Sequence, residues 1–385
     1  MIKANFDQPY CFAKQKNKQS GVTLIIFAMI LLLAGATVLF SVLDSNSIKI
    51  ERGKKTAVAL GEAKAALLGW STGHATMPGA LPCPDTNNTG SSGTCTATAG
   101  IIGRLPWKTL GANDLRDGNG ECLWYALSPV YRNTITVASR VSNPINSNIP
   151  GTITVKGANG TALPAPVNPA IAVVIAPGAP LTGQDRSNAS STVCGGNTTA
   201  SNYLDTAQGV NNSTGNVSGS NYTFIAGAAS DTFNDRLIYI TAEDLYGPVR
   251  KRIADELAGV GTPGNTGLRK YYVNNQVYPW AGDISGNVVT NTSSGYVPYN
   301  VLTLTPSSLR SWMINNGWMS LVTYQIGADF NPNSSASFPQ QCTAGNCVTV
   351  RGAQVPASVT LGGGIGTWTS RVCETNAVMT SCPLP

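Results

Sequence analysis

A long apolar run near the N-terminus is the strongest feature of the hydropathy pattern. No charged residue occurs from Val22 to Leu43, a stretch of 22 residues that follows a lysine-rich start. An α-helix rises ~1.5 Å per residue, so this stretch would reach about 33 Å, enough for a hydrocarbon core of about 30 Å. A secretory signal has an apolar region of only roughly 7–15 residues. The pattern therefore predicts a transmembrane helix over residues 22–43.

The residues after this run predict that the helix continues with an amphipathic pattern. Helix-forming residues follow without a proline before Pro78. Val58, Ala65 and Leu68 recur at helical spacing, which places them on one apolar stripe. We therefore expect one helix over residues 22–70, membrane-spanning in its first half and amphipathic in its second.

Short strand-like and helix-like patterns alternate through the rest of the chain. Residues 169–178 are apolar on both faces, as in a central strand, and residues 234–261 predict a strand followed by a helix. Thr241 suits the N-cap of that helix, and Gly259 suits its end. Similar patterns occur at residues 101–111, 121–131, 152–157, 308–327 and 347–373.

These patterns predict an α+β fold in which a long N-terminal helix packs on a strand-rich, disulfide-bonded head. The expected organisation is a cytoplasmic leader over residues 1–21, the helix over 22–70 and an exported head over 71–385. A head of about 315 residues can hold one large core or two subdomains, and the latter would divide near residues 240–260.

The distribution of charge indicates which side of a membrane each part occupies. Charged residues make up only 11% of the chain, and Ser, Thr, Asn and Gly fill many loops, as in exported proteins. The net charge of +6 forms no basic stripe, so we expect no nucleic-acid partner. Positive charge before the apolar run predicts a cytoplasmic N-terminus and an exported head. The charged residues before the run are Lys3, Asp7, Lys14, Lys16 and Lys18.

The cysteines agree with export. Cys11 precedes the apolar run and would stay in the cytoplasm, which leaves an even number beyond it. An even number in an oxidising compartment suggests up to four disulfides, although spacing alone does not fix the pairing. Local closure favours Cys83–Cys95, Cys342–Cys347 and Cys373–Cys382, which leaves Cys122 with Cys194. The spacing of Cys342 and Cys347 does not suit a zinc site.

The sequence favours an assembly or binding role over catalysis. His74 is the single histidine, and it lies in a Gly- and Thr-containing loop. General-base catalysis and metal binding both commonly use histidine. The sequence also contains no nucleophile elbow, phosphate-binding loop or zinc motif. The carboxylate pairs are Asp114/Asp117 and Glu243/Asp244. Their role cannot be judged without the distances and orientations of the carboxyl groups. We expect no enzyme.

The best candidate for ligand chemistry is "NDLRDGNGE", residues 113–121. Asp117, Asn119 and Glu121 alternate with glycines, as oxygen ligands do in calcium loops. The stretch lacks the spacing of an EF-hand, and the same letters form an ordinary turn. Calcium is therefore a possible ligand here and the plain turn is the alternative.

The N-terminal features together resemble the type IV pilin and pseudopilin superfamily. The resemblance rests on the basic leader ending in "KQSG", the run "VTLIIFAMILLLAGATVLF" and the amphipathic extension. In that family a membrane peptidase cuts after the glycine and methylates the new N-terminus, which implies a cut between Gly21 and Val22. The family's long helix is half anchor and half spine of a β-sheet head. Stretches such as "RLPWKTLGANDLRDGNGECLWYALSP" also look like large bacterial pilin-like proteins.

One departure from the family pattern concerns the fifth mature position. The family normally has Glu there, and its carboxylate pairs with the N-terminal amine of an adjoining subunit; here the residue is Ile26. Tip-located large pseudopilins show the same departure. The resemblance therefore implies a minor subunit that initiates or caps a type IV pilus or a type II secretion pseudopilus.

Partners and location follow from the same resemblance. The expected partners are other pilin or pseudopilin subunits, the prepilin peptidase and the bacterial inner membrane, with the head in the periplasm and then at a filament tip. The first alternative is an anchored adhesin outside any filament, whose contact face would include Trp280, Trp312 and Trp318. The second alternative is an anchored periplasmic enzyme.

Overall fold

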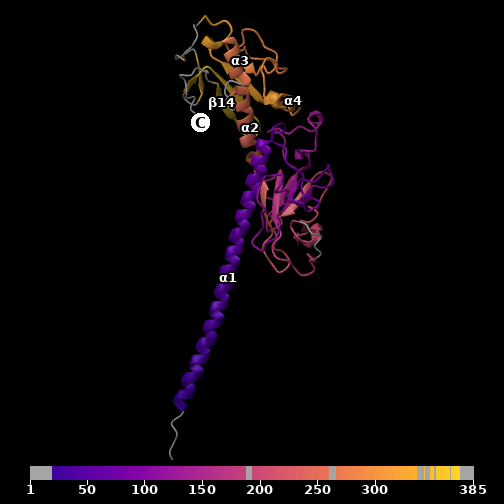
Figure 1. Ribbon diagram of the computed structural model, residues 1–385, viewed down its shortest axis with the longest axis vertical. Coiled ribbons are helices and arrows are strands. Elements are labelled where there is room, and N and C mark those ends of the chain that lie inside the picture. Colours follow the sequence, from indigo (N-terminus) through magenta and orange to yellow (C-terminus); the bar gives the residue numbers. More distant parts are fainter. Residues whose placement is uncertain are drawn as a thin grey trace, which may run out of the picture. The chain divides into compact units, whose positions relative to one another are not determined.

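The computed structural model of the protein describes residues 20–187, 193–259, 266–335, 342, 347–350, 353–364 and 366–372. Within the first helix, side chains are described from Ser47 onward and at Met29. The chain divides into two units, one ending at Gly53 and the other beginning at Lys54. All sheets that the structure describes lie in the second unit, and its architecture is α+β (Figure 1).

The first sheet has four antiparallel strands in the order β1-β2-β4-β8. Strand β4 (Ala172–Ala176) pairs with β2 (Trp124–Leu127) on one side and β8 (Arg236–Ile240) on the other, and all five of its residues are buried. Strand β1 (Ile102–Arg104) forms one edge. The prediction of a central strand within residues 169–178 is confirmed, because both faces of β4 are covered.

The second sheet has the order β14-β13-β10-β9 and is also antiparallel. Its strands are β9 (Ser294–Tyr296), β10 (Val322–Ile326), β13 (Ala357–Leu361) and β14 (Trp368–Val372). In β10 the burial alternates residue by residue, as expected for a strand with one face on the core. The predicted strands within 308–327 and 347–373 are confirmed.

Helix α2 (Ala242–Ala258) connects the two sheets, because it follows β8 of the first and packs on β13 and β14 of the second (Figure 1). Thr241 and Asp244 form a reciprocal capping box at its start, and Gly259 ends it in the left-handed conformation with φ 82°. The predicted caps are therefore confirmed. Buried α2 side chains belong to one apolar core that includes residues of both sheets.

Polar contacts also join the segment after β2 to the second sheet's helices. The Asn316 side-chain oxygen accepts from the Ile145 backbone N–H at 2.7 Å, and the Asn146 side-chain amide donates to the Asn316 carbonyl at 2.7 Å. The Tyr246 hydroxyl donates to the Tyr131 hydroxyl at 2.8 Å. These groups are buried, so each bond satisfies a polar atom that water cannot reach.

Smaller elements complete the second unit. The paired ones are β3 (Ile153–Lys156) with β7 (Tyr222–Ile225) in parallel, β5 (Thr206–Ala207) with β6 (Val210–Asn211), and β11 (Val348–Val350) with β12 (Ala353–Val355). The remaining α-helices are α3 (Gly267–Asn275) and α4 (Ser307–Asn315).

Helix α1 spans Ser20–Gly73, and the predicted fold class needs correction there. Among the residues that the structure describes, no helix is both long and apolar enough to cross a membrane. The prediction of a transmembrane half is therefore wrong for the described part. The side chains described in α1 lie, apart from Met29, from Ser47 onward, and there charged residues interrupt every apolar run: Lys49, Glu51, Arg52, Lys54, Lys55, Glu62 and Lys64. The side chains of the predicted span, residues 22–43, lie outside the description except for Met29.

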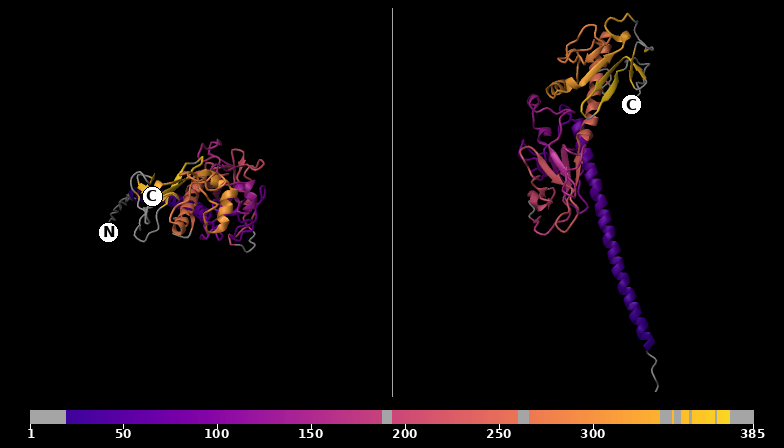
Figure 2. Two further views of the ribbon diagram at one scale, coloured as in Figure 1. Left: turned by 90° about the horizontal axis from the view of Figure 1, so that it is seen from above. Right: turned by 180° about the vertical axis from the view of Figure 1, so that it is seen from behind.

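The apolar stripe on α1 also differs from the predicted one. Val58 is 52% exposed and Ala65 is exposed, whereas Leu68 is half-buried. The buried face lies about one position away, at Thr56, Ala59, Leu60, Ala63, Leu67 and Ser71. This face belongs to the same core as the sheets, and the last turns of α1 lie beside the first sheet (Figure 2). Alanines and leucines occur on both faces, so the repeat alone does not identify which face is buried.

We expect the two neighbouring leucines to differ strongly in their contribution to stability. Leu67 is fully buried, so Leu67→Ala removes packed methyl groups and should lower the free energy of unfolding by about 2–5 kcal/mol. Leu68→Ala should cost less than half as much, because Leu68 is only partly covered. Urea unfolding of both variants measures the difference. Equal losses would mean that the buried face is misassigned.

Candidate functional site

The predicted processing and assembly residues lie near the beginning of α1. Gly21, Val22 and Ile26 have helical backbone there, but their side chains lie outside the described residues. Residues 1–19 of the leader, including Cys11, also lie outside the description. Cleavage after Gly21 and the role of Ile26 therefore stay predictions.

The C-terminal part of α1 is held firmly on one side. The Lys64 ammonium forms an ion pair of 2.8 Å with the Asp244 carboxylate in the capping box of α2. The Arg252 guanidinium, also from α2, donates to the carbonyls of Thr72 and His74, the latter at 2.7 Å. With the buried stripe, these contacts fix the helix end against the rest of its unit.

The opposite side of the same helix segment carries small residues. Ala57, Gly61, Ala65 and Gly69 recur every four residues and are all exposed, with the exposed Val58 beside them. A Cβ atom added at Gly61 or Gly69 would meet nothing within 4 Å. A row of this kind lets the backbone of another helix approach closely. We call Ala57, Gly61, Ala65 and Gly69 the small-residue row.

The calcium candidates form a hydrogen-bonded turn. The buried Asp117 accepts the backbone N–H groups of Asn119 and Glu121 with one oxygen, at 2.8 and 3.0 Å, and that of Gly178 with the other, at 2.9 Å. Next to it, the Gly118 N–H donates to the Thr56 hydroxyl of α1 at 2.9 Å. The two oxygens of Asp117 are thus already engaged by backbone donors, as in an Asx turn. The geometry favours the turn over a calcium loop.

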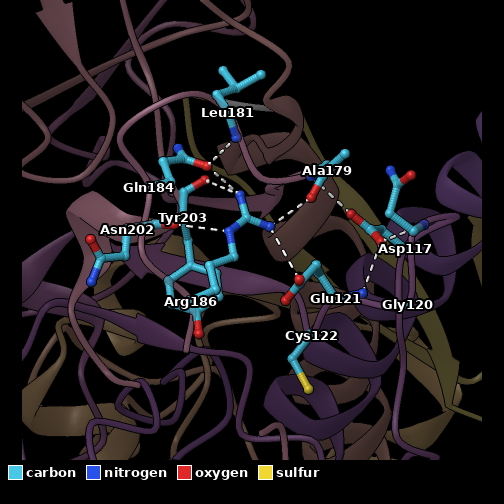
Figure 3. Close-up of polar contacts among 12 residues, drawn as sticks. Asp117, Gly120, Glu121, Cys122, Ala179, Leu181, Gln184, Arg186, Asn202 and Tyr203 are labelled. Carbon is cyan, nitrogen blue, oxygen red and sulfur yellow. Dashed lines mark hydrogen bonds and ion pairs between the residues drawn. The ribbon is translucent and has the colours of Figure 1, made fainter. Parts of the chain in front are cut away.

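Glu121, the third calcium candidate, pairs with a cationic side chain and does not point to a common ion site with Asp117 and Asn119. Its carboxylate forms a 3.2 Å ion pair with Arg186, whose side chain is only 7% exposed (Figure 3). The Arg186 guanidinium also donates to the Gly178 and Asn202 carbonyls at 2.8 and 2.9 Å and to the Gln184 side chain at 2.6 Å. Arg186 therefore ties the loop after β4 to the turn that contains Glu121.

Arg186 is a structurally important residue that no sequence pattern indicated. It lies in a segment of small polar residues without periodicity, so no pattern marks it. The low content of charged residues could have indicated it. In a chain with only 11% charged residues, an isolated arginine in a loop is expected to have a structural partner.

Three disulfides are present among the described residues. They join Cys83 to Cys95, Cys122 to Cys194, and Cys342 to Cys347, and these are three of the four pairs that spacing suggests. The predicted partners Cys373 and Cys382 lie outside the described residues. The Asp114 carboxylate lies close to the sulfurs of Cys122 and Cys194, but disulfide sulfurs are not thiolate ligands, so this group is not a metal site.

The other titratable candidates have structural partners. The His74 imidazole accepts the Met77 backbone N–H at 3.1 Å, and burial together with the nearby Arg252 lowers its pKa. Asp114 pairs with Arg116 at 2.7 Å, while Asp244 caps α2. None of these contacts brings His74 to a carboxylate.

The three tryptophans proposed for an adhesive face are largely enclosed. Trp312 and Trp318 are fully buried and stack on each other, with ring centroids 6.1 Å apart. Trp280 is 8% exposed. They serve as core aromatics, so a contact surface would have to use other residues.

A buried pair of carboxyl groups was not anticipated. One oxygen of Asp235 accepts from the Asp205 backbone N–H and the Asn212 amide at 2.8 and 2.9 Å, while Asp205 accepts from the backbone N–H groups of Asn234 and Asp235. Burial, and then the charge of Asp205, raises the pKa of Asp235 to about 8. Arg186 opposes this shift through its positive charge.

Comparisons of the chain with models of protein families, with curated proteins and with solved structures found no match.

We predict that Asp235 makes stability fall as pH rises. The unfolded carboxyl has an ordinary pKa of about 3.9, so between about pH 4 and pH 8 only the folded state keeps the proton. The folded state is thus favoured at the acidic end of this window and loses that advantage toward pH 8. Urea unfolding from pH 5 to pH 9 should give a shallower decline for Asp235→Asn than for the original chain.

A matched control is Asp231→Asn, because Asp231 is exposed on the same loop. It should leave the pH profile unchanged. If the unfolding free energy of Asp235→Asn depends on pH in the same way as that of Asp231→Asn, the buried pair does not hold a proton in the folded state.

Proposed function

We propose that this chain is a minor, prepilin-type subunit that initiates or caps a filament of the type IV pilus or type II secretion pseudopilus class. The supporting observation is the small-residue row on a helix whose other side is fixed by Lys64, Asp244 and Arg252. A helix held on one side and smooth on the other suits lateral packing against the helices of other subunits. The proposed partners are such subunits and the prepilin peptidase, with the head outside the cytoplasm.

The proposed place at a filament end rests on two features of the sequence. Ile26 cannot form the carboxylate–amine pair that brings a following subunit of this superfamily into register. The head of about 315 residues would also crowd its copies along a narrow fibre, since heterologous contacts repeat without closing. A subunit present in few copies at an end avoids both problems.

A binding protein outside any filament is the competing proposal. It would use the head alone, and the small-residue row would have no partner. Substitutions in the row distinguish the two, because only a filament subunit should lose its function through a change on this face of α1.

Processing is the first test. In a host with a prepilin peptidase, the mature chain should begin at a methylated Val22, and Gly21→Leu should leave the leader attached. The reason is that the family's peptidase cuts directly after this glycine, so a bulky side chain at this position should block the cut. Intact-mass measurement and the N-terminal peptide report both outcomes, and Ser20→Ala is the control that should still be cut. A chain that keeps its leader in the original protein would contradict the proposal.

Assembly is the second test, and it uses Gly61→Gln. The glutamine projects from the centre of the small-residue row, so it should prevent close helix packing and reduce copurification with filament subunits at least tenfold. It should not weaken the isolated chain, because glycine is about 1 kcal/mol less favourable than good helix formers in a helix. Unchanged or increased unfolding free energy would separate lost assembly from lost folding.

The matched control for assembly is Glu62→Gln. It places the same side chain at the next exposed position, outside the row. Copurification should stay at the level of the original protein. Equal loss in both variants, or no loss in Gly61→Gln, would mean that the row is not a packing surface.

A further inference from the structure

The connection from α1 to the residues that follow it is a tight turn. The helix ends at Gly73, and the chain then turns back so that the Gly79 backbone N–H donates to the Ser71 carbonyl at 3.1 Å. Met77 lies within this turn and packs against the core of the second unit. The conformation of residues 74–77 therefore determines how the end of α1 continues into the head.

The imidazole of His74 organises this turn by accepting two backbone hydrogen bonds with one nitrogen. Its Nδ1 accepts the N–H of Met77 at 3.1 Å and that of Thr76 at 3.3 Å. A ring nitrogen that accepts hydrogen bonds carries no proton, so the imidazole in this turn is neutral and its proton is on Nε2. A protonated imidazole has N–H donors on both nitrogens and accepts neither bond. The turn therefore requires a neutral His74.

A positive charge beside the imidazole also opposes its protonation. The Arg252 guanidinium, from α2, donates to the carbonyl of His74 at 2.7 Å and to that of Thr72. On the side of α1, the Trp70 ring meets the imidazole edge-on, with ring centroids 4.8 Å apart. Burial, and then the charge of Arg252, lowers the pKa of His74 below the ordinary value of 6.5. Among the described residues no carboxylate forms an ion pair with His74, and Glu256 of α2 acts on Arg252 instead.

We propose that His74 is a proton-sensitive latch for the end of α1, closed while the imidazole is neutral and opened when it is protonated. A proton added at Nδ1 removes the acceptor of Thr76 and Met77 and places a second positive charge beside Arg252. Both effects favour separation of the turn from α2. The end of α1 is then held by its buried face and the ion pair of Lys64. The proposal does not depend on filament assembly.

The direction of the pH dependence follows from the lowered pKa of His74. Above about pH 6.5 the imidazole is neutral in the folded and the unfolded chain, so the latch is closed and its full contribution to stability is present. As the pH falls from there toward the pKa of the folded state, only the unfolded chain binds the proton, and this contribution is lost. The buried Asp235 acts in the opposite direction, so a local signal at the turn is needed to separate the two effects.

The test is NMR on the purified full chain with labelled histidine and methionine, between pH 4 and pH 8. His74 is the single histidine of the chain, so its imidazole signal needs no assignment. At pH 8 the nitrogen shifts should show the proton on Nε2, and the imidazole should titrate with a pKa below 6.5. The Met77 amide signal, identified with Met77→Leu, should change with the same midpoint. Below it, Met77 hydrogen exchange, corrected for the intrinsic effect of pH, should become roughly tenfold faster.

Three results would overturn the proposal. They are a proton on Nδ1 at pH 8, an imidazole pKa of 6.5 or higher, and a Met77 amide that does not follow the imidazole titration. Each of them would mean that the turn does not depend on a neutral Nδ1.

Two variants separate the charge of His74 from the turn itself. The asparagine of His74→Asn accepts backbone N–H groups of the residues that follow it, as in an Asx turn, and gains no charge in acid. This variant should keep the melting temperature of the original protein at pH 8, and its Met77 amide should not titrate between pH 5 and pH 7. His74→Lys brings a permanent charge and no acceptor, so Met77 exchange should already be fast at pH 8. A protected Met77 amide in His74→Lys, or a titrating one in His74→Asn, would refute the latch.

The matched control is Glu256→Gln, because burial raises the pKa of Glu256 and its charge acts on Arg252. If protonation of Glu256 opened the turn, the Met77 titration would disappear in this variant and persist in His74→Asn. We expect the reverse result, with the titration kept in Glu256→Gln and absent in His74→Asn. Loss of the titration in Glu256→Gln alone would exclude His74 as the group that takes up the proton.

Discussion

The ion pair between Lys64 and Asp244 joins the two helices, α1 and α2, around which the sheets of the second unit are packed. Asp244 closes the capping box of α2 and at the same time pairs with α1, while α2 connects the two four-stranded sheets. Partial burial raises the pKa of Asp244, but the hydrogen bonds from Lys64 and Thr241 outweigh this and bring its pKa below the ordinary value. One carboxylate therefore takes part both in the N-terminal cap of α2 and in the contact of α2 with α1.

Other charged residues act in a similar way, as internal ties between loops. Arg140 is fully buried and donates to the carbonyls of Val130 and Arg132, and Arg186 does the same for the loop after β4. The strands are short, so many backbone carbonyls lie in loops outside any sheet ladder. Buried carbonyls need donors, and an arginine supplies several from one side chain. Some of the few charged residues are therefore used inside the molecule, and the surface is weakly charged.

Local patterns in the sequence predicted those parts of the fold that depend on neighbouring residues. The caps of α2 at Thr241 and Gly259 and the central position of β4 follow from residue types within a few positions. The buried face of α1 did not, because alanine and leucine occur on both sides of the helix and only the head decides between Leu67 and Leu68. The expected transmembrane half was also not found, since no helix among the described residues is long and apolar enough to cross a membrane.

The polar sites were harder to predict for a different reason. Arg186 and Asp235 were not singled out, because their partners Glu121 and Asp205 lie tens of residues away along the chain. Asp117, by contrast, was noticed because its neighbours share its turn, although the chemistry assigned to it was that of calcium. A local motif identifies a turn; whether the turn binds an ion depends on which donors reach its oxygens, and here backbone N–H groups do so.

The glycines of α1 are difficult to explain within a single chain. Gly61 and Gly69 lie in a regular helix at exposed positions, and no atom of the described chain approaches the place of a side chain. Glycine lowers helix stability by about 1 kcal/mol relative to alanine, so each position weakens α1 without an internal benefit. A close internal contact or a left-handed turn would justify such residues, and neither occurs at these two positions. The proposed filament assembly would account for them, because a second helix packed at short distance requires an absent side chain.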